Sequence, residues 1–490
     1  MPPSYFSRAN NMRARGDLRN EPDSKREYLP VARSAATADV SESPQPASLA
    51  PVLWAVSIAS FGALAFGYHL GVVNGPLSAI AADLGFAGNA ALQGTVVSSL
   101  LAGAAVGSLG GSGLADSLGR KTTLLLDAIP LLGGALLAAT ASSLTGIIAG
   151  RVLSGIGIGL ASALVPLYIS EIAPTKVRGS LGSINQLVIC IGIVAALVVN
   201  VVIPATSWRT MFYLASIPPV LLALGLTLTP ESPRWLFSKG RTQEAEAAAE
   251  KLWGPSGPAE LTAGSSKTDV EGGSAAEEPV SMGELLSNKG VKIGCAIFLL
   301  QQFSGINAIV YFSSSVFAQA GITNAALASA AVQMTNVLTT VVAASLMDRA
   351  GRKQLLTLSF TGMGISMLAM AAGLGFKQLA GLSSTVAIVG TVAYVISFAL
   401  GAGPVPGLLV PEITPARLRG RAVSLALATH WVFNYAIGQL FLPALAAVGV
   451  SGVYLFFALI CAITVMFTNS QIVETKGRSL DEIQKLMAAK

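Results

Sequence analysis

Long apolar segments, separated by short polar ones, dominate the sequence. A segment of about 20 apolar residues is long enough to cross a lipid bilayer as a helix. By this criterion we count roughly twelve candidate spans. They lie near residues 52–73, 91–113, 124–142, 145–169, 181–203, 209–229, 291–317, 326–347, 355–376, 384–410, 421–445 and 448–468. Short stretches of strand-type alternation are missing, which argues against a β-barrel. The pattern therefore predicts an all-α membrane protein with twelve transmembrane helices.

The composition points to the same class. Hydrophobic residues make up 52% of the chain and charged residues only 11%, whereas about 25% of a soluble protein is charged. The net charge of +6 does not indicate nucleic-acid binding, because many basic residues lie between spans, where they orient a membrane protein. Cys190, Cys295 and Cys461 lie inside spans and are expected to be small core residues.

Polar segments divide the chain. Residues 1–50 are basic and rich in Ser, as in an organelle transit peptide, but they also contain acidic residues, which transit peptides avoid. A transit peptide and a plain disordered cytosolic tail therefore both remain open. Two halves of six spans each occupy residues 51–235 and 291–468. The linker at 236–290 is expected to be intracellular, with one short helix followed by a flexible Gly-, Ser- and Pro-rich part, and residues 469–490 form a polar tail.

Two polar motifs occur once in each half. An Asp followed by a Gly-Arg-Lys loop comes after the second and the eighth spans, and a Glu followed by Arg-Gly comes after the fourth and the tenth. The similar spacing indicates an internal duplication of six spans with the same orientation, the parallel repeat of a secondary transporter. Charged groups at helix ends can pair across helices, and such pairs would lock the halves on one membrane face. The predicted intracellular charge locks are Asp116, Arg120, Glu171, Arg178, Asp348, Arg352, Glu412 and Arg419.

The basic residues also predict the orientation in the membrane. They are concentrated on connections that follow even-numbered spans, whereas the other connections hold little beyond Arg209 and Lys377. Both termini are therefore expected on the positive, cytosolic side. The alternative interpretation of the charge locks is that they only set this orientation and cap helix ends.

The seventh span carries a dense group of neutral amides, namely Gln301, Gln302 and Asn307. A buried amide without a partner costs roughly 1–3 kcal/mol, so these groups must face one. A regular helix does not place all three on one narrow stripe, so either they ring a cavity or Gly305 loosens the turn between them. Because an amide both donates and accepts hydrogen bonds, the group suits a neutral polyol. The alternative is hydrogen bonding between helices.

Other spans contain further polar or irregular positions. Gln186 in the fifth span and Asn336 in the eighth add neutral amides. Pro404 and Pro406 lie in a Gly- and Pro-rich run of the tenth span. A helix broken at membrane depth is tolerated only where it is buried in protein or lines a cavity. Trp431 lies in the middle of the eleventh span, where its aromatic face can stack on a sugar ring.

Three of the ionisable residues inside spans stand out. His69, Asp127 and Arg151 are functional candidates for this reason, because charged groups are expensive in a bilayer. Arg151 needs a partner, and a pair with Asp127 is one option that the sequence leaves open. For His69 the alternative is a neutral imidazole bonded to a neighbouring helix.

The fourth span contains Gly155, Gly157 and Gly159 at alternate positions. A Gly-x-Gly-x-Gly run can belong to a nucleotide-binding loop, but such a loop follows a strand. This run lies within an apolar span instead, so we interpret it as a surface for close helix packing.

These motifs together resemble the sugar porter family of the major facilitator superfamily, over about residues 52–483. The resemblance rests on the Gly-Arg-Lys loops of both halves and on three runs, PESPR at 230–234, QQFSGIN at 301–307 and VETKGRSL at 473–480. Three further features look most like the plastidic glucose transporters of plants and algae, namely FGYHLGVVNG at 66–75, GAGPVP at 401–406 and His430-Trp431. This similarity favours a transit peptide and the plastid inner envelope, with the plasma and vacuolar membranes as alternatives.

The resemblance implies roles for individual residues. It implies an extracytosolic gate at Tyr311, together with Pro404 and Pro406 in the tenth span. His430 stands where the family usually has Asn or Gln. The implied sugar contacts are Gln186, Gln301, Gln302, Asn307, Asn336, His430 and Trp431.

Two positions depart from the family pattern. Gly407 occupies the place of a tenth-helix Trp, so one stacking wall for the sugar is missing. His69 occupies the place of an Asp that communicates with Arg151 in proton-coupled members. A carboxylate can take up a proton and release the arginine, whereas a neutral imidazole has no charge to lose. This departure favours facilitated diffusion over proton coupling.

The leading hypothesis is a hexose transporter, with glucose as the expected sugar, that works by alternating access. The runner-up is a proton–sugar symporter that uses Asp127 or His69. A membrane sugar sensor is the alternative from a different class. We expect neither an enzyme nor a metal or other cofactor, because no catalytic or metal-ligand constellation is present and the chain has only 2 His. The expected partners are the hexose and the lipid bilayer, with no nucleic acid, and the oligomeric state does not follow from the sequence.

Overall fold

The computed structural model describes residues 48–174, 177–264, 281–347, 350–476, 478 and 480–489. The described residues form helices joined by turns and contain no strand, which confirms the predicted all-α class. The tail at 1–47 and the predicted charge-lock residue Asp348 lie outside the described residues.

The N-terminal half forms helices wherever the sequence predicts a span. Its last crossing is made of two short helices, α7 and α8, with a turn between them. The helices are α1 (Ala50–Gly71), α2 (Leu77–Asp83), α3 (Ala90–Leu118), α4 (Arg120–Ala139), α5 (Leu144–Ile172), α6 (Arg178–Val202), η2 (Ala205–Ser207), α7 (Trp208–Leu214) and α8 (Ile217–Thr227).

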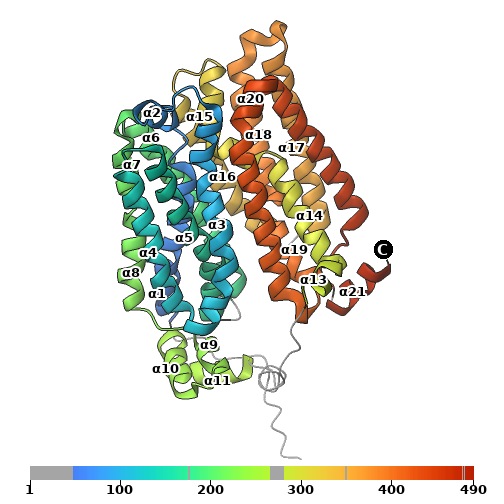
Figure 1. The fold of residues 1–490 in the computed structure, drawn as a ribbon. Helices are drawn as coiled ribbons and strands as arrows, with labels where there is room; N and C mark the ends of the chain where they lie inside the picture. Colours follow the sequence, from blue (N-terminus) through green and yellow to red (C-terminus); the bar gives the residue numbers. More distant parts are fainter. Residues whose placement is uncertain are drawn as a thin grey trace, which may run out of the picture. The chain divides into compact units, whose positions relative to one another are not determined.

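Between the halves, the described residues form four short helices. They are α9 (Pro233–Ser238), α10 (Thr242–Trp253), α11 (Gly257–Gly264) and α13 (Met282–Ser287). The indole Nε1 of Trp253 donates to the carbonyl oxygen of Ile172 at 2.8 Å, so α10 is attached to the end of α5. Figure 1 shows α9, α10 and α11 together at one end of the N-terminal half.

The C-terminal half repeats the pattern with two interrupted crossings. Its helices are α14 (Lys289–Phe303), α15 (Ile306–Gln319), α16 (Ala325–Met347), α17 (Arg352–Gly375), η3 (Lys377–Leu382), α18 (Ser383–Ser397), η4 (Phe398–Ala402), α19 (Val405–Ile413), η5 (Ala416–Leu418), α20 (Arg419–Gln471) and α21 (Leu480–Ala489). Among the described residues, 11 helical stretches are long and apolar enough to cross a membrane. The last of them, α20, has 53 residues and leaves helical geometry at Gly449 (φ 72°), so it makes two crossings and completes the predicted twelve.

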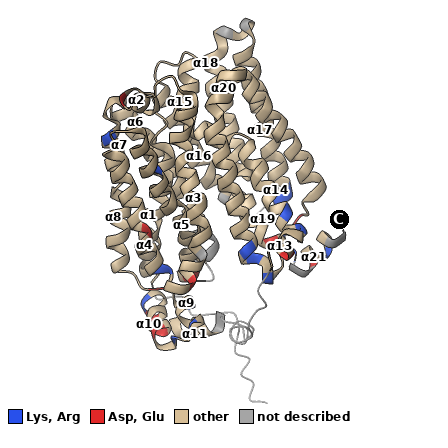
Figure 2. Cartoon of the chain, in the orientation of Figure 1, with Lys and Arg blue, Asp and Glu red and all other residues tan. Residues whose placement is uncertain are grey.

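The two halves pack along helices that lie far apart in the sequence. The inter-half contacts join α3 to α20 and α6 to α16, with a smaller contact between α1 and α15. Figure 1 shows the blue and green N-terminal helices on one side and the yellow to red C-terminal helices on the other. In Figure 2 most of the blue segments, which mark Lys and Arg, lie at the end that carries α9 to α11, α13 and α21, which we take as the cytosolic end.

The Gly-x-Gly-x-Gly run packs as the sequence predicts. A Cβ atom built on Gly155 would lie 2.0 Å from the carbonyl oxygen of Leu100 on α3. A Cβ on Gly159 would lie 2.2 Å from the carbonyl oxygen of Ala104, also on α3. The missing side chains let the backbones of α3 and α5 touch, which is how small residues join membrane helices.

Both predicted helix breaks are present and lie next to each other. Gly305 has a left-handed backbone (φ 102°) and separates α14 from α15, as expected for a glycine that loosens the turn. In the tenth span, a turn of π-helix at η4 precedes Pro404 and the start of α19. The amide of Gln301 donates to the carbonyl oxygen of Ala402 at this second break. The two interrupted helices are therefore joined at membrane depth, where the freed backbone groups find partners.

Candidate functional site

Gln302 is the centre of a network of neutral polar side chains. Its amide Nε2 lies 2.7 Å from Nδ1 of His430 on α20 and 3.3 Å from Oε1 of Gln301. Its Oε1 accepts from the amide of Asn307 on α15. Gln302 thus links α14, α15 and α20, and the left-handed turn at Gly305 brings Asn307 back beside it.

Aromatic rings from both halves border this network. Trp431 is 2% exposed and contacts His430 edge-on, with 5.1 Å between ring centroids. Phe66 on α1, in the opposite half, lies 5.5 Å from the ring of Trp431. The indole Nε1 of Trp431 is buried and has no hydrogen-bond partner among the described residues. An aromatic surface with a free donor therefore lies beside the amides, between the two halves.

Gln186 and Asn336 lie at a different place in the same interface. Gln186 is on α6 and Asn336 is on α16, and both contact the thiol of Cys190. The described residues show no hydrogen bond between this pair and the network of Gln302. The structure therefore places the predicted sugar contacts in two groups, one around Gln302 and one around Cys190.

The predicted gate residue Tyr311 is fully buried on α15. Its hydroxyl donates to Oδ1 of Asn434 on α20 at 3.0 Å. Nearby, Asn74 just beyond α1 donates to Oγ of Ser313 at 3.0 Å and accepts from the backbone N–H of Ser314 at 3.2 Å. Asn74 therefore holds the N-terminal half against α15 at the end opposite the basic residues.

Sequence reasoning did not single out Asn74. It belongs to the FGYHLGVVNG run, but nothing in that run indicates that its partners lie on a helix of the other half. The other predicted gate residues, Pro404 and Pro406, lie at the start of α19.

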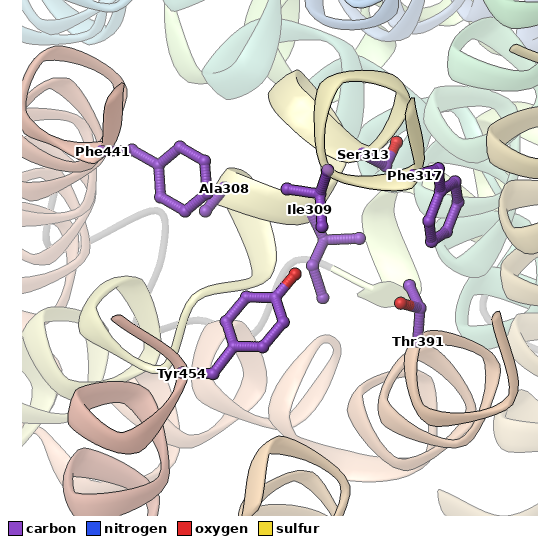
Figure 3. Close-up of a pocket in the computed structure, with 8 residues that line it drawn as sticks. Ala308, Ile309, Ser313, Phe317, Thr391, Phe441 and Tyr454 are labelled. Carbon is purple, nitrogen blue, oxygen red and sulfur yellow. The ribbon is translucent and has the colours of Figure 1, made fainter. Parts of the chain in front are cut away.

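A small cavity lies between α15 and residues of α18 and α20. Figure 3 shows its lining, with Ile309 and Ser313 from α15 opposite Tyr454 and Thr391. Its space is about that of one water molecule, which is far too small for a sugar. The cavity is therefore not the sugar site.

Arg151 does not pair with Asp127. Its guanidinium is 1% exposed and donates to the carbonyl oxygens of His69 at 2.8 Å and Val96 at 3.2 Å. The carboxyl oxygens of Asp127 and both ring nitrogens of His69 have no hydrogen-bond partner among the described residues. The pair of Arg151 and Asp127 that the sequence left open is thus absent, and backbone carbonyl groups accept the hydrogen bonds of Arg151 instead.

The charged motifs at the cytosolic end form the same arrangement twice. In the N-terminal half Arg120 pairs with Glu171 at 2.9 Å and with Asp116 at 3.1 Å. In the C-terminal half Arg352 pairs with Glu412 at 3.2 Å. These pairs join helices within one half, and in the described part of the chain no ion pair crosses between the halves. These pairs brace each half, and a lock between the halves stays a prediction, since Asp348 and the side chain of Arg178 lie outside the described residues.

Two further predicted lock residues lie at helix starts. The side chain of Arg178, at the start of α6, is not among those described. Arg419 begins α20 and pairs with no carboxylate among the described residues.

Two glutamates that the sequence analysis did not assign complete these braces. Glu231 accepts from the backbone N–H groups of Arg120 and Lys121, both at 3.0 Å. Glu474 accepts in the same way from Arg352 at 2.8 Å and Lys353 at 3.2 Å. Each carboxylate caps the first turn of the helix that carries the Gly-Arg-Lys motif. The sequence could have indicated both glutamates, since they lie in runs that carry the family resemblance.

A family model described as "Sugar (and other) transporter" matches residues 55–487. The chain belongs to this family of membrane transporters. Plastidic glucose transporter 4 of Arabidopsis thaliana is 53% identical over 438 residues, which are 88% of this chain and 80% of the relative. Glucose transporter GlcP of Staphylococcus epidermidis is 38% identical, over 87% of this chain and 95% of the relative.

Solved structures of a sugar transporter have the same fold. The inward open conformation of the xylose transporter XylE from E. coli matches with a TM-score of 0.76 and 27% identity, over 89% of this chain and 99% of that chain. The proton:xylose symporter XylE bound to 6-bromo-6-deoxy-D-glucose matches with a TM-score of 0.73 and 27% identity, over the same shares. These matches agree with the predicted twelve-helix fold of the major facilitator superfamily.

Proposed function

We propose that this transporter carries a neutral hexose, with glucose as the principal substrate, by facilitated diffusion. The observation that carries the proposal is the network of Gln302 with Gln301, Asn307 and His430. Its members are neutral, and they can donate to and accept from hydroxyl groups. Relatives named as glucose transporters are up to 53% identical to this chain over the aligned residues, which supports the same substrate class.

The sugar binds between the halves and exchanges hydrogen bonds with these side chains. The free indole Nε1 of Trp431 gives one donor, and its ring together with Phe66 gives an apolar wall. Gly407, where a Cβ atom would meet open space, offers no aromatic ring to the sugar. We assign the substrate contacts to Gln186, Gln301, Gln302, Asn307, Asn336, His430 and Trp431.

The two ends of the molecule differ in how the halves are joined, and this difference is the basis of the alternating access that we propose. At the end away from the basic residues, Asn74 and α15 join the halves, whereas the charge braces at the cytosolic end lie within each half. This arrangement corresponds to a transporter that is closed outside. Opening outward requires the bonds of Asn74 to break and α15 to move about the turn at Gly305.

Proton coupling is the second candidate function. A buried carboxyl group without a partner is a possible proton site, and Asp127 is 0% exposed and unpaired. Against this, Arg151 is bound to backbone carbonyls. Among the described residues neither Asp127 nor His69 bonds to it through a side chain, so no carboxylate is placed to release it. We therefore favour facilitated diffusion.

The proposed location is the plastid inner envelope, since relatives with 43 to 53% identity are named plastidic glucose transporters. The function itself is tested by counterflow of labelled glucose into proteoliposomes loaded with unlabelled glucose. We expect rapid counterflow that unlabelled glucose inhibits and glucose 6-phosphate does not, because the assigned contacts include no cation to hold a phosphate. Absence of counterflow, or equal inhibition by the phosphate, would contradict a neutral hexose site.

A further inference from the structure

Cys190 joins the two halves through its sulfur. The thiol is 3% exposed and lies one helical turn beyond Gln186 on α6. The amide Nε2 of Gln186 is 3.6 Å from the sulfur. The amide Nδ2 of Asn336 is 3.7 Å away and Oγ1 of Thr340 is 3.9 Å away, both on α16 of the other half. One buried sulfur therefore contacts polar groups from both halves.

The hydrogen atoms can be assigned around this thiol. The two amide nitrogens can only donate, so the sulfur accepts from both. The hydroxyl of Thr340 donates to the carbonyl oxygen of Asn336 at 2.8 Å, which leaves its oxygen free to accept the S–H proton of Cys190. Sulfur is a weak acceptor, so the amides are held in place but are released at little cost.

The α16 side of this cluster has a spare donor. Asn336 also donates to Oε1 of Gln333 at 3.2 Å. Gln333 is 3% exposed, and its Nε2 has no hydrogen-bond partner among the described residues. A buried donor without an acceptor destabilises this arrangement, which favours exchange of partners during the transport cycle.

We propose that Cys190 is a positioning residue for the sugar site. Its sulfur accepts from the amides of Gln186 and Asn336, one from each half, and so orients them toward the position of a sugar. When the sugar binds, its hydroxyl groups replace the sulfur as partners of these amides. This inference rests on the proposed hexose function, and it adds a residue that does not itself contact the sugar.

Two substitutions separate positioning from packing. Cys190→Val keeps an apolar group of similar size but removes the acceptor, so we expect KM for glucose to rise about three- to tenfold with Vmax nearly unchanged. Cys190→Ser keeps a donor and an acceptor, so we expect its KM to stay within about twofold of wild type. If Cys190 only fills space, KM should rise more in Cys190→Ser than in Cys190→Val, because valine is then the better replacement.

Cys461 provides the matched control. It is a second buried cysteine, 0% exposed on α20, and no amide bonds to its sulfur among the described residues. Both Cys461→Val and Cys461→Ser should leave KM within about twofold of wild type, provided that each protein elutes as a single species. The ratio of glucose to galactose transport is the second readout. It should fall in Cys190→Val alone, because loosely held amides discriminate less between epimers.

The outcomes are distinguishable. A wild type that transports glucose, with Cys190→Val unchanged in KM or better than Cys190→Ser, overturns the role of Cys190 alone. A wild type without glucose transport overturns both this inference and the hexose proposal. A rise in KM in Cys190→Val with rescue in Cys190→Ser supports the positioning role.

Discussion

Replacing Gln302 with leucine should reduce glucose transport about 100-fold or more. The substitution removes the partner of Gln301, Asn307 and His430 at once. Each buried polar group left without a partner costs about 1–3 kcal/mol, and 1.4 kcal/mol corresponds to tenfold in binding. The sugar also loses a contact that both donates and accepts. Counterflow in proteoliposomes measures the loss.

The control for this experiment is Gln354→Leu, the same change at an exposed position on α17. It should transport at close to the wild-type rate. Gln302→Glu should also fail, although it keeps the shape of the side chain, because a carboxylate cannot donate to Oε1 of Gln301. If the Gln302→Leu protein elutes as a single species and keeps more than half of wild-type transport, the network of Gln302 is not part of the sugar site.

The second large effect is on folding. Gly155→Val should abolish production of a folded transporter, because its Cβ would lie 2.0 Å from the carbonyl oxygen of Leu100. A backbone atom cannot yield as a flexible side chain can, so α3 and α5 would have to separate along their whole contact. Fluorescence-detected size-exclusion chromatography of the detergent-extracted protein measures the outcome.

Gly110→Val is the matched control, since a Cβ on Gly110 of α3 meets nothing within 4 Å. It should elute as wild type does. A monodisperse and active Gly155→Val protein would show that the contact between α3 and α5 tolerates a separation that its geometry does not suggest.

The fold was largely predictable because a bilayer imposes a simple rule on sequence. Each crossing needs a long apolar segment, and the spacing of these segments predicts nearly all of the helices. The break at Gly305 was one of the two explanations that the sequence left open, because three amides on one regular helix did not share a face. The two crossings within α20 were likewise predicted as separate spans, and the structure divides them at the non-helical Gly449.

The candidate site was only partly predictable. The amide-rich stretch indicated where polar side chains gather, because unpaired amides are costly in hydrocarbon. The identities of the partners depend on tertiary packing, so the bond between Gln302 and His430 did not follow from the sequence. For the same reason the carbonyl partners of Arg151 and the thiol between Gln186 and Asn336 came only from the structure.

The central claim is passive transport, and the most direct test is glucose uptake into proteoliposomes with and without an inward proton gradient. We predict that wild-type uptake reaches the same equilibrium level in both cases, because Arg151 is held by backbone carbonyls rather than by a carboxylate. His69→Asp places a titratable carboxylate beside Arg151 and should make uptake depend on the gradient. Wild-type accumulation of glucose above its external concentration would contradict the account and make Asp127 the candidate proton site.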